Sequence, residues 1–234
     1  MAGSAIRQAP SDRWPREAVR RITTLWWLKA AGTTLYMWMF FQCYFYLLQH
    51  QAYPVTVIPT TALDKAIPFS PAWVLVYFSL WIYVSLPGAL QANWSSLFWH
   101  GVAALLMCAI GLACYYWYPT TFVQQGTDWS QMPPGRLLQS VDRAGNVFPS
   151  MHVAFAVFAW AWLRRALHQM RAPRWPHVAN ALWCIAISYS TLATKQHVAW
   201  DVIAGCILGM ATGVATARAA DWLQGRRRHA LAPL

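Results

Sequence analysis

Residues 198–217 read VAWDVIAGCILGMATGVATA, a run of twenty residues in which Asp201 carries the only charge. A helix that crosses the hydrocarbon core of a bilayer needs ~20 predominantly apolar residues. The run therefore predicts a transmembrane helix. Asp201 and three glycines recur every four residues and share one face of this helix. These glycines are Gly205, Gly209 and Gly213. Small residues on one face let two helices approach closely in lipid.

Five more apolar runs precede this one in the chain. They lie at about 28–49, 71–90, 96–118, 150–163 and 178–194. Hydrophobic residues make up 58% of the 234 residues and charged residues only 11%, whereas a soluble domain carries about 25% charged residues. The mean hydropathy of +0.30 points the same way. The sequence therefore predicts an all-α protein, a bundle of six transmembrane helices.

Arginine is concentrated before the first apolar run, between the fourth and the fifth, and after the sixth. These arginines are Arg7, Arg13, Arg16, Arg20, Arg21, Arg164, Arg165, Arg171, Arg174, Arg218, Arg226, Arg227 and Arg228. With six helices they all fall on one side, which the positive-inside rule assigns to the cytoplasm. We therefore expect both termini in the cytoplasm and the loops at 50–70 and 119–149 outside a bacterial-type inner membrane.

The same pattern divides the chain into three parts. Residues 1–22 form a basic cytoplasmic segment without the apolar stretch of a cleavable signal peptide. Residues 23–217 form the six-span catalytic membrane domain, and residues 218–234 a basic cytoplasmic tail. Because the net charge of +11 lies in these topogenic segments, no nucleic-acid partner is expected. The five cysteines fall inside apolar runs without metal-ligand spacing, so we expect no disulfide, metal or other cofactor.

Two polar motifs stand at the mouths of apolar runs, where ionisable residues are costly and tend to be functional. Pro149-Ser150-Met151-His152 opens the fourth run. Proline and serine there are typical of a helix start, whose free N–H groups attract anions. Lys195-Gln196-His197-Val198-Ala199-Trp200-Asp201 opens the sixth run. We expect the glycine face to pack against Ala156 and Ala159, which would make the two motifs face each other.

These residue types suit phosphoryl transfer. His197 and Asp201 are four residues apart, so the carboxylate can orient one imidazole nitrogen and leave the other to attack a substrate. His197 is therefore a candidate nucleophile that forms a phosphohistidine, and His152 a candidate general acid and base. Ser150, Lys195 and helix-start N–H groups can hold the phosphate oxygens. This chemistry requires no metal.

The two motifs resemble signatures of the type 2 phosphatidic acid phosphatase superfamily, which shares its catalytic core with vanadium haloperoxidases. The second signature, P-S-x-H, matches residues 149–152, and the third, S-R-x5-H-x3-D, matches residues 190–201 in register apart from its arginine. The ordered pair at the starts of the fourth and sixth apolar runs is more specific than either signature alone. The resemblance implies for the two histidines, Asp201 and Ser150 the roles given above.

The third signature differs from that of the family at its arginine, which is replaced by Thr191. Threonine carries no charge, and Lys195, two residues before the histidine, is expected to supply the cation instead. The stretch Ala193-Thr194-Lys195-Gln196-His197 resembles the branch of the superfamily related to inositol phosphorylceramide synthases.

The first signature, K-x6-R-P, is absent, since the chain contains no Arg-Pro dipeptide. Residues 118–125 stand about where it belongs. Arg136 or Arg143 can supply the missing cation, and we favour Arg143 because it is closer to Ser150 in sequence. The alternative is that both arginines are ordinary solvated loop charges.

The favoured function is a membrane enzyme that hydrolyses a lipid phosphomonoester or diphosphate on the periplasmic or extracellular side. Phosphatidic acid, a phosphatidylglycerol phosphate and a polyprenyl phosphate are the substrate types considered. One alternative is a lipid phosphotransferase, in which an alcohol replaces water. Another is a non-catalytic lipid-binding or transport bundle, although such a bundle has no need of all four motif residues together. Expected partners are the lipid substrate and membrane lipids, and a homodimer stays open.

Overall fold

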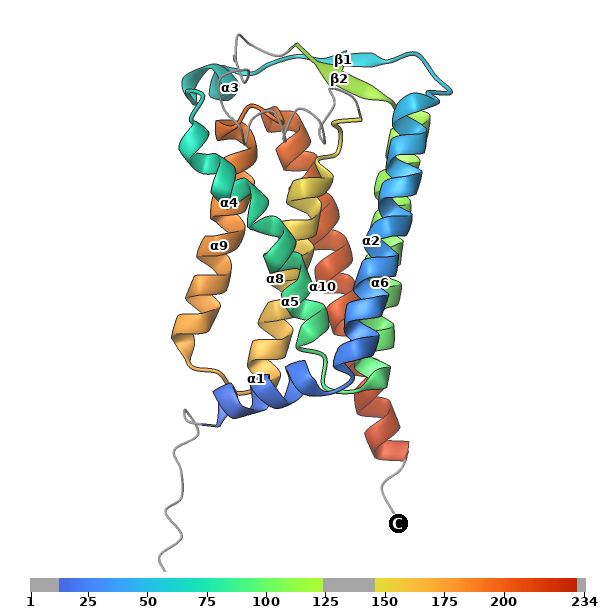
Figure 1. Cartoon of the computed structure of the whole chain (residues 1–234), viewed down its shortest axis with the longest axis vertical. Helices are drawn as coiled ribbons and strands as arrows, with labels where there is room; N and C mark the ends of the chain where they lie inside the picture. Colours follow the sequence, from blue (N-terminus) through green and yellow to red (C-terminus); the bar gives the residue numbers. More distant parts are fainter. Residues whose placement is uncertain (1–12, 124–145, 231–234) are drawn as a thin grey trace, which may run out of the picture.

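The structure is a computed structural model that describes residues 13–123 and 146–230. Most of these residues are helical, and long helices run side by side along the bundle while a short one crosses its end (Figure 1). The helices are α1 (Trp14–Thr23), α2 (Trp26–Gln49), α3 (Ala62–Ala66), α4 (Val74–Phe78), α5 (Leu80–Ala89), α6 (Trp94–Trp117), α8 (Met151–Gln169), α9 (Arg174–Ala193) and α10 (Ala199–Ala230), with a 3-10 turn at Pro71–Trp73. Two strands, β1 (Thr56–Ile58) and β2 (Thr120–Phe122), pair in parallel.

Helices occupy all six predicted apolar runs, but several bounds differ from the prediction: α8 extends to Gln169 and α9 begins at Arg174. The run at 71–90 is divided at Ser79, whose hydroxyl donates to the carbonyl of Val76 at 2.6 Å, a competing bond that favours a bend. The last helix continues beyond residue 217 to Ala230. Among the described residues, three helical segments are long and apolar enough to cross a membrane: Pro71–Ala89, Trp94–Trp117 and Ala199–Leu223. These segments indicate a membrane-embedded protein.

Helix α8 forms the centre of the bundle. One apolar cluster joins it to α5 and α9, and a second joins it to α2, α6 and α10. Trp162 on α8 is completely buried, and its indole N–H donates to the hydroxyl of Thr216 on α10 at 3.2 Å. Burial on most sides explains why α8 is rich in alanine, which lets several helices approach it closely.

The glycine face of α10 packs on α8, as predicted, but the predicted contact residues on α8 are wrong. A Cβ atom on Gly205 would lie 2.5 Å from the carbonyl oxygen of Ser150. Gly209 and Gly213 make similarly close approaches further along α8, to Ala154, Val157, Phe158 and Ala161. Ala156 and Ala159 instead belong to the cluster shared with α5 and α9. The spacing on α10 did not specify which face of α8 it meets.

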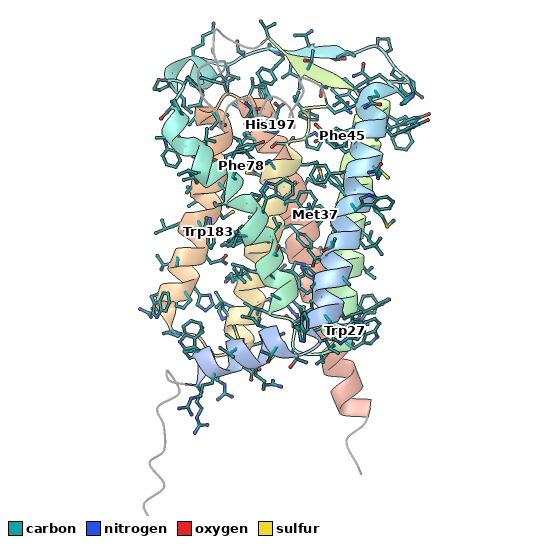
Figure 2. All side chains as sticks on the ribbon, viewed as in Figure 1. Trp27, Met37, Phe45, Phe78, Trp183 and His197 are labelled. Carbon is teal, nitrogen blue, oxygen red and sulfur yellow. The ribbon has the colours of Figure 1, made fainter. Side chains whose placement is uncertain are left out.

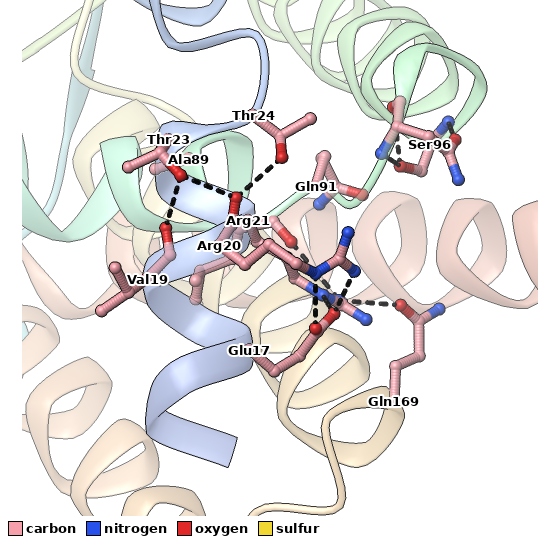
Figure 3. Close-up of polar contacts among 12 residues, drawn as sticks. Glu17, Val19, Arg20, Arg21, Thr23, Thr24, Ala89, Gln91, Ser96 and Gln169 are labelled. Atoms are coloured by element: carbon pink, nitrogen blue, oxygen red, sulfur yellow. Dashed lines mark hydrogen bonds and ion pairs between the residues drawn. The ribbon is translucent and has the colours of Figure 1, made fainter. Parts of the chain in front are cut away.

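Helix α1 lies across the end of the bundle where α10 ends, opposite His197 (Figures 1 and 2). Glu17 accepts bonds from Arg20 and Arg21, and Arg21 also donates to Gln169 on α8 at 3.2 Å (Figure 3). The hydrogen bond from Arg20 is the main reason that the pKa of Glu17 is lowered to about 2. These contacts fix α1 to the bundle end.

Lys29 lies near the start of α2, a position from which a lysine often extends its ammonium group to the membrane surface. It lies at the α1 end of the bundle, but its side chain is buried. Its ammonium group donates to the carbonyls of Arg21, Ala89 and Gln91 at 2.5 to 2.9 Å. The three carbonyl oxygens replace water around the buried charge. These hydrogen bonds connect α2, which carries Lys29, to α1 and to the turn after α5.

The opposite end of the bundle is covered by parts of the segments 50–70 and 119–149. Both were predicted to be loops, but their described parts also contain two short strands and a short helix. Strands β1 and β2 pair there, and α3 begins with a capping box in which Thr61 and Asp64 bond each other's backbone N–H groups. We call residues 56–67 and 120–122 the outer cover. It packs on the chain beside both motifs in a small apolar cluster of Ile58, Phe122, Val147, Phe148 and Val198.

Candidate active site

The first motif begins α8 as the sequence predicted. Ser150 is the N-cap residue, and its hydroxyl oxygen accepts from the N–H of Val153 at 3.3 Å. The preceding Pro149 carbonyl accepts from the hydroxyl of Tyr115 on α6 at 2.9 Å. The N–H of Ser150 donates to the carbonyl of Asp201 at 3.0 Å. This last bond joins the two motifs directly, so the expectation that they meet is confirmed.

His152 lies in the first turn of α8 against Tyr77 of α4. The two rings are stacked, with centroids 3.8 Å apart and an interplanar angle of 17°. The Nε2 atom of His152 is 3.1 Å from the carbonyl oxygen of Tyr77. Stacking and this polar contact fix the ring orientation, which a general acid requires. No pattern in the sequence predicted Tyr77 as the partner of His152.

His197 and Asp201 are close, as their spacing predicted. The Nδ1 atom of His197 is 3.5 Å from Oδ2 of Asp201, longer than a good hydrogen bond. Oδ2 accepts from the N–H of Val198 at 3.1 Å, whereas Oδ1 has no partner among the described residues. Asp201 therefore caps the start of α10 and faces the imidazole. Because Nδ1 faces the carboxylate, Nε2 is the nitrogen left for a substrate.

Lys195 lies in the turn between α9 and α10, with a left-handed φ of 55°. Its ammonium group donates to the carbonyl oxygens of Asp64 and Ile67 in the outer cover at 2.6 and 2.5 Å. The Asp64 carboxylate in turn accepts from the N–H of Ala199, the first residue of α10, at 2.8 Å. Asp64 thus ties the cover to both ends of the turn that carries His197.

An apolar cavity of about 700 Å³ extends from the two motifs into the bundle. His152, His197 and Asn146 line it at the covered end, and Lys29 and His100 line it toward the α1 end. Its walls come from α2, α4, α5, α6 and α8. Figure 2 shows the direction: His197 lies at one end of the bundle, Phe78 beside it, and Met37 about halfway down.

The remaining predicted site residues cannot be placed beside this site. Arg136 and Arg143 lie outside the described residues, so their assignment stays a prediction. The site does contain two buried polar residues that no sequence motif assigned to it, Asp64 and Asn146. Asp64 could have been singled out because acidic residues are rare in this chain, which has only seven. Throughout the described parts of the chain, no three histidine, cysteine or acidic side chains form a group suited to a metal.

The fold and the site together define a membrane-embedded helical protein whose buried histidines, serine and carboxylate suit phosphate-ester chemistry. A family model of the PAP2 superfamily matches residues 92–224, more than half of the chain. The chain therefore belongs to the PAP2 superfamily, a membership that supports phosphatase-type enzyme activity on phosphate esters. Neither the curated proteins nor the solved structures gave a significant match.

Proposed function

We propose that the protein is a metal-independent lipid phosphate phosphatase that hydrolyses a lipid phosphomonoester or diphosphate. The observation that carries this proposal is the apolar cavity that begins at His152 and His197. Its lining residues on α2 run from Leu28 to Tyr44, a length of about 24 Å at the rise of an α-helix. A cavity of this length and character fits a lipid chain whose phosphate lies between the two histidines.

The proposed reaction has two displacements at phosphorus. Nε2 of His197 attacks the phosphoryl group, the bond to the lipid oxygen breaks, and His152 donates a proton to that oxygen. His152 then removes a proton from water, which attacks the phosphohistidine and releases inorganic phosphate. Asp201 stabilises the imidazole of His197. Ser150, whose oxygen accepts the cap bond, keeps its hydroxyl hydrogen for a phosphate oxygen.

The competing function is a lipid phosphotransferase, in which an alcohol resolves the phosphohistidine. Purified protein incubated with labelled lipid phosphates distinguishes the two. A phosphatase releases inorganic phosphate without any alcohol present, whereas a phosphotransferase yields a labelled lipid only when an acceptor is added. Testing phosphatidic acid, a phosphatidylglycerol phosphate and a polyprenyl phosphate together identifies the preferred lipid.

The cavity predicts a dependence on chain length. Gly101 lines the cavity, and an added Cβ atom would meet no atom within 4 Å, so a side chain introduced there would occupy part of the cavity. Gly101→Leu should lower kcat/KM for dioleoyl phosphatidic acid by about tenfold or more, with little change for the dioctanoyl lipid. The control is Ala109→Leu on the same helix, at an exposed position outside this cavity. Equal losses for both lipids would contradict the chain assignment.

We further propose six spans, cytoplasmic termini and an outward-facing site in a bacterial-type inner membrane, with residues 23–217 as the catalytic membrane domain. Exposed arginines of α1 and the α8–α9 turn, together with Arg218 on α10, lie at the end opposite His197, which supports this orientation. Single cysteines replacing Gln125 and Asp142 in a cysteine-free variant should react with an impermeant reagent added outside intact cells. Labelling from the cytoplasmic side alone would show that the proposed topology is wrong.

A further inference from the structure

Asn146 is a buried side chain whose amide makes no hydrogen bond within the described part of the chain. It is 2% exposed and lines the cavity together with His152 and His197. Neither Oδ1 nor Nδ2 has a hydrogen-bond partner among the described residues. Asn180, also buried, shows the usual arrangement, because its amide accepts from Tyr83 at 2.6 Å and donates to the carbonyl of Trp160 at 3.1 Å. Buried polar groups normally have such partners.

The backbone alone does not explain why residue 146 is an asparagine. Its φ of 53° lies in the left-handed region, which glycine adopts more readily and without burying an amide. An unpartnered buried amide destabilises the folded state. Asparagine is therefore the costlier choice for the turn itself, which indicates that the amide serves a molecule that enters the cavity.

The position of Asn146 identifies the chemistry of that molecule. A phosphoryl group held between His152 and His197 presents anionic oxygens to the same end of the cavity, and an amide N–H is a suitable donor to them. A neutral donor also suits a buried position beside an apolar chain, where an unpaired cation would be costly. The amide requires no partner in the resting state because the substrate brings the acceptor.

We propose that Asn146 is a phosphate-binding residue of this site, donating from Nδ2 to a phosphoryl oxygen in the ground and transition states. The inference rests on the proposed function, and it supplies one phosphate contact that the absent first signature would otherwise provide. Asn146 lies four residues before Ser150, so the turn that begins α8 carries both contacts.

The test uses two substitutions that suit the left-handed backbone. Asn146→Gly removes the amide without straining the turn, and turnover of the preferred lipid phosphate should fall by about 10². Asn146→Asp keeps the shape but adds a negative charge toward the phosphate, so its loss should be at least as large. The melting temperature of Asn146→Gly should be unchanged or higher, because a destabilising buried amide is gone.

Asn180→Ala is the control for a structural asparagine and should lower the melting temperature, since it breaks paired hydrogen bonds. If Asn146→Gly destabilises the protein as much as Asn180→Ala does, Asn146 is a structural residue and the inference is wrong. Wild-type turnover in Asn146→Gly would overturn it as well.

Binding of inorganic phosphate gives a measurement that does not depend on turnover. Phosphate should raise the melting temperature of the wild type, and Asn146→Gly should need about tenfold more phosphate for the same shift. If the wild type binds phosphate through Asn146 but hydrolyses no lipid phosphate, the phosphatase proposal fails and the Asn146 inference stands. Equal phosphate binding by wild type and Asn146→Gly would remove the inference even if the enzyme is an active phosphatase.

Discussion

Replacing His197 by alanine is expected to reduce turnover by about 10⁴ or more, because the covalent route then has no nucleophile. His152→Ala should also be inactive on lipid phosphates, whose leaving oxygen needs a proton. With p-nitrophenyl phosphate, whose leaving group needs none, His152→Ala should accumulate the phosphohistidine. An acid-labile phosphoprotein, detected with labelled substrate after rapid quenching, measures this directly.

His168→Ala provides the matched control, since His168 is an exposed histidine of α8 that does not line the cavity. It should retain most of the turnover. An acid-labile phosphoprotein found in His197→Ala but not in the wild type would show that His197 is not the nucleophile. The roles of the two histidines would then have to be reversed.

Lys195→Ala is the second substitution expected to have a large effect. If Lys195 donates to the phosphoryl oxygens in the transition state, its loss should lower kcat by about 10² to 10³. Lys195→Arg should keep part of the activity, because the charge remains while its shape and reach change. The alanine variant keeps a Cβ atom at the same left-handed position, so the substitution changes the side chain and not the backbone preference.

The structure gives Lys195 a competing role, because its ammonium group is bonded to the outer cover. Thermal melting separates the two roles. If Lys195 is purely structural, Lys195→Ala should lower the melting temperature while turnover of the remaining folded enzyme stays normal. That result would contradict a phosphate contact. Lys65 is an exposed lysine of the outer cover. Lys65→Ala therefore controls for a general loss of positive charge.

The sequence predicted the parts of the fold that depend on local pattern. Apolar run length located the helices, and the Pro149-Ser150 pair located the start of α8. The spacing of His197 and Asp201 predicted their proximity, which the structure shows at 3.5 Å. These features depend on the helix repeat and on residue chemistry, both of which can be read from one chain.

Contacts between segments far apart in the chain were harder to predict from the sequence. The prediction of which face of α8 meets α10 was wrong, because small residues such as Ala156 and Ala159 suit any close helix contact. The parallel pairing of β1 with β2 was missed, since two three-residue strands have too little pattern to be recognised. Asn146 carries the chemistry of a turn residue, and only its burial in the cavity distinguishes it from one.

The bond from Ala199 to Asp64 joins residues 135 positions apart in the chain. During synthesis, Asp64 leaves the ribosome long before the turn that it holds. A chain that has reached residue 198 contains five of the six long apolar segments and both histidines but lacks the helix that fixes His197. Closing so long a loop is entropically unfavourable and slow relative to local helix formation. Catalytic competence should therefore arise as one of the last events of biogenesis.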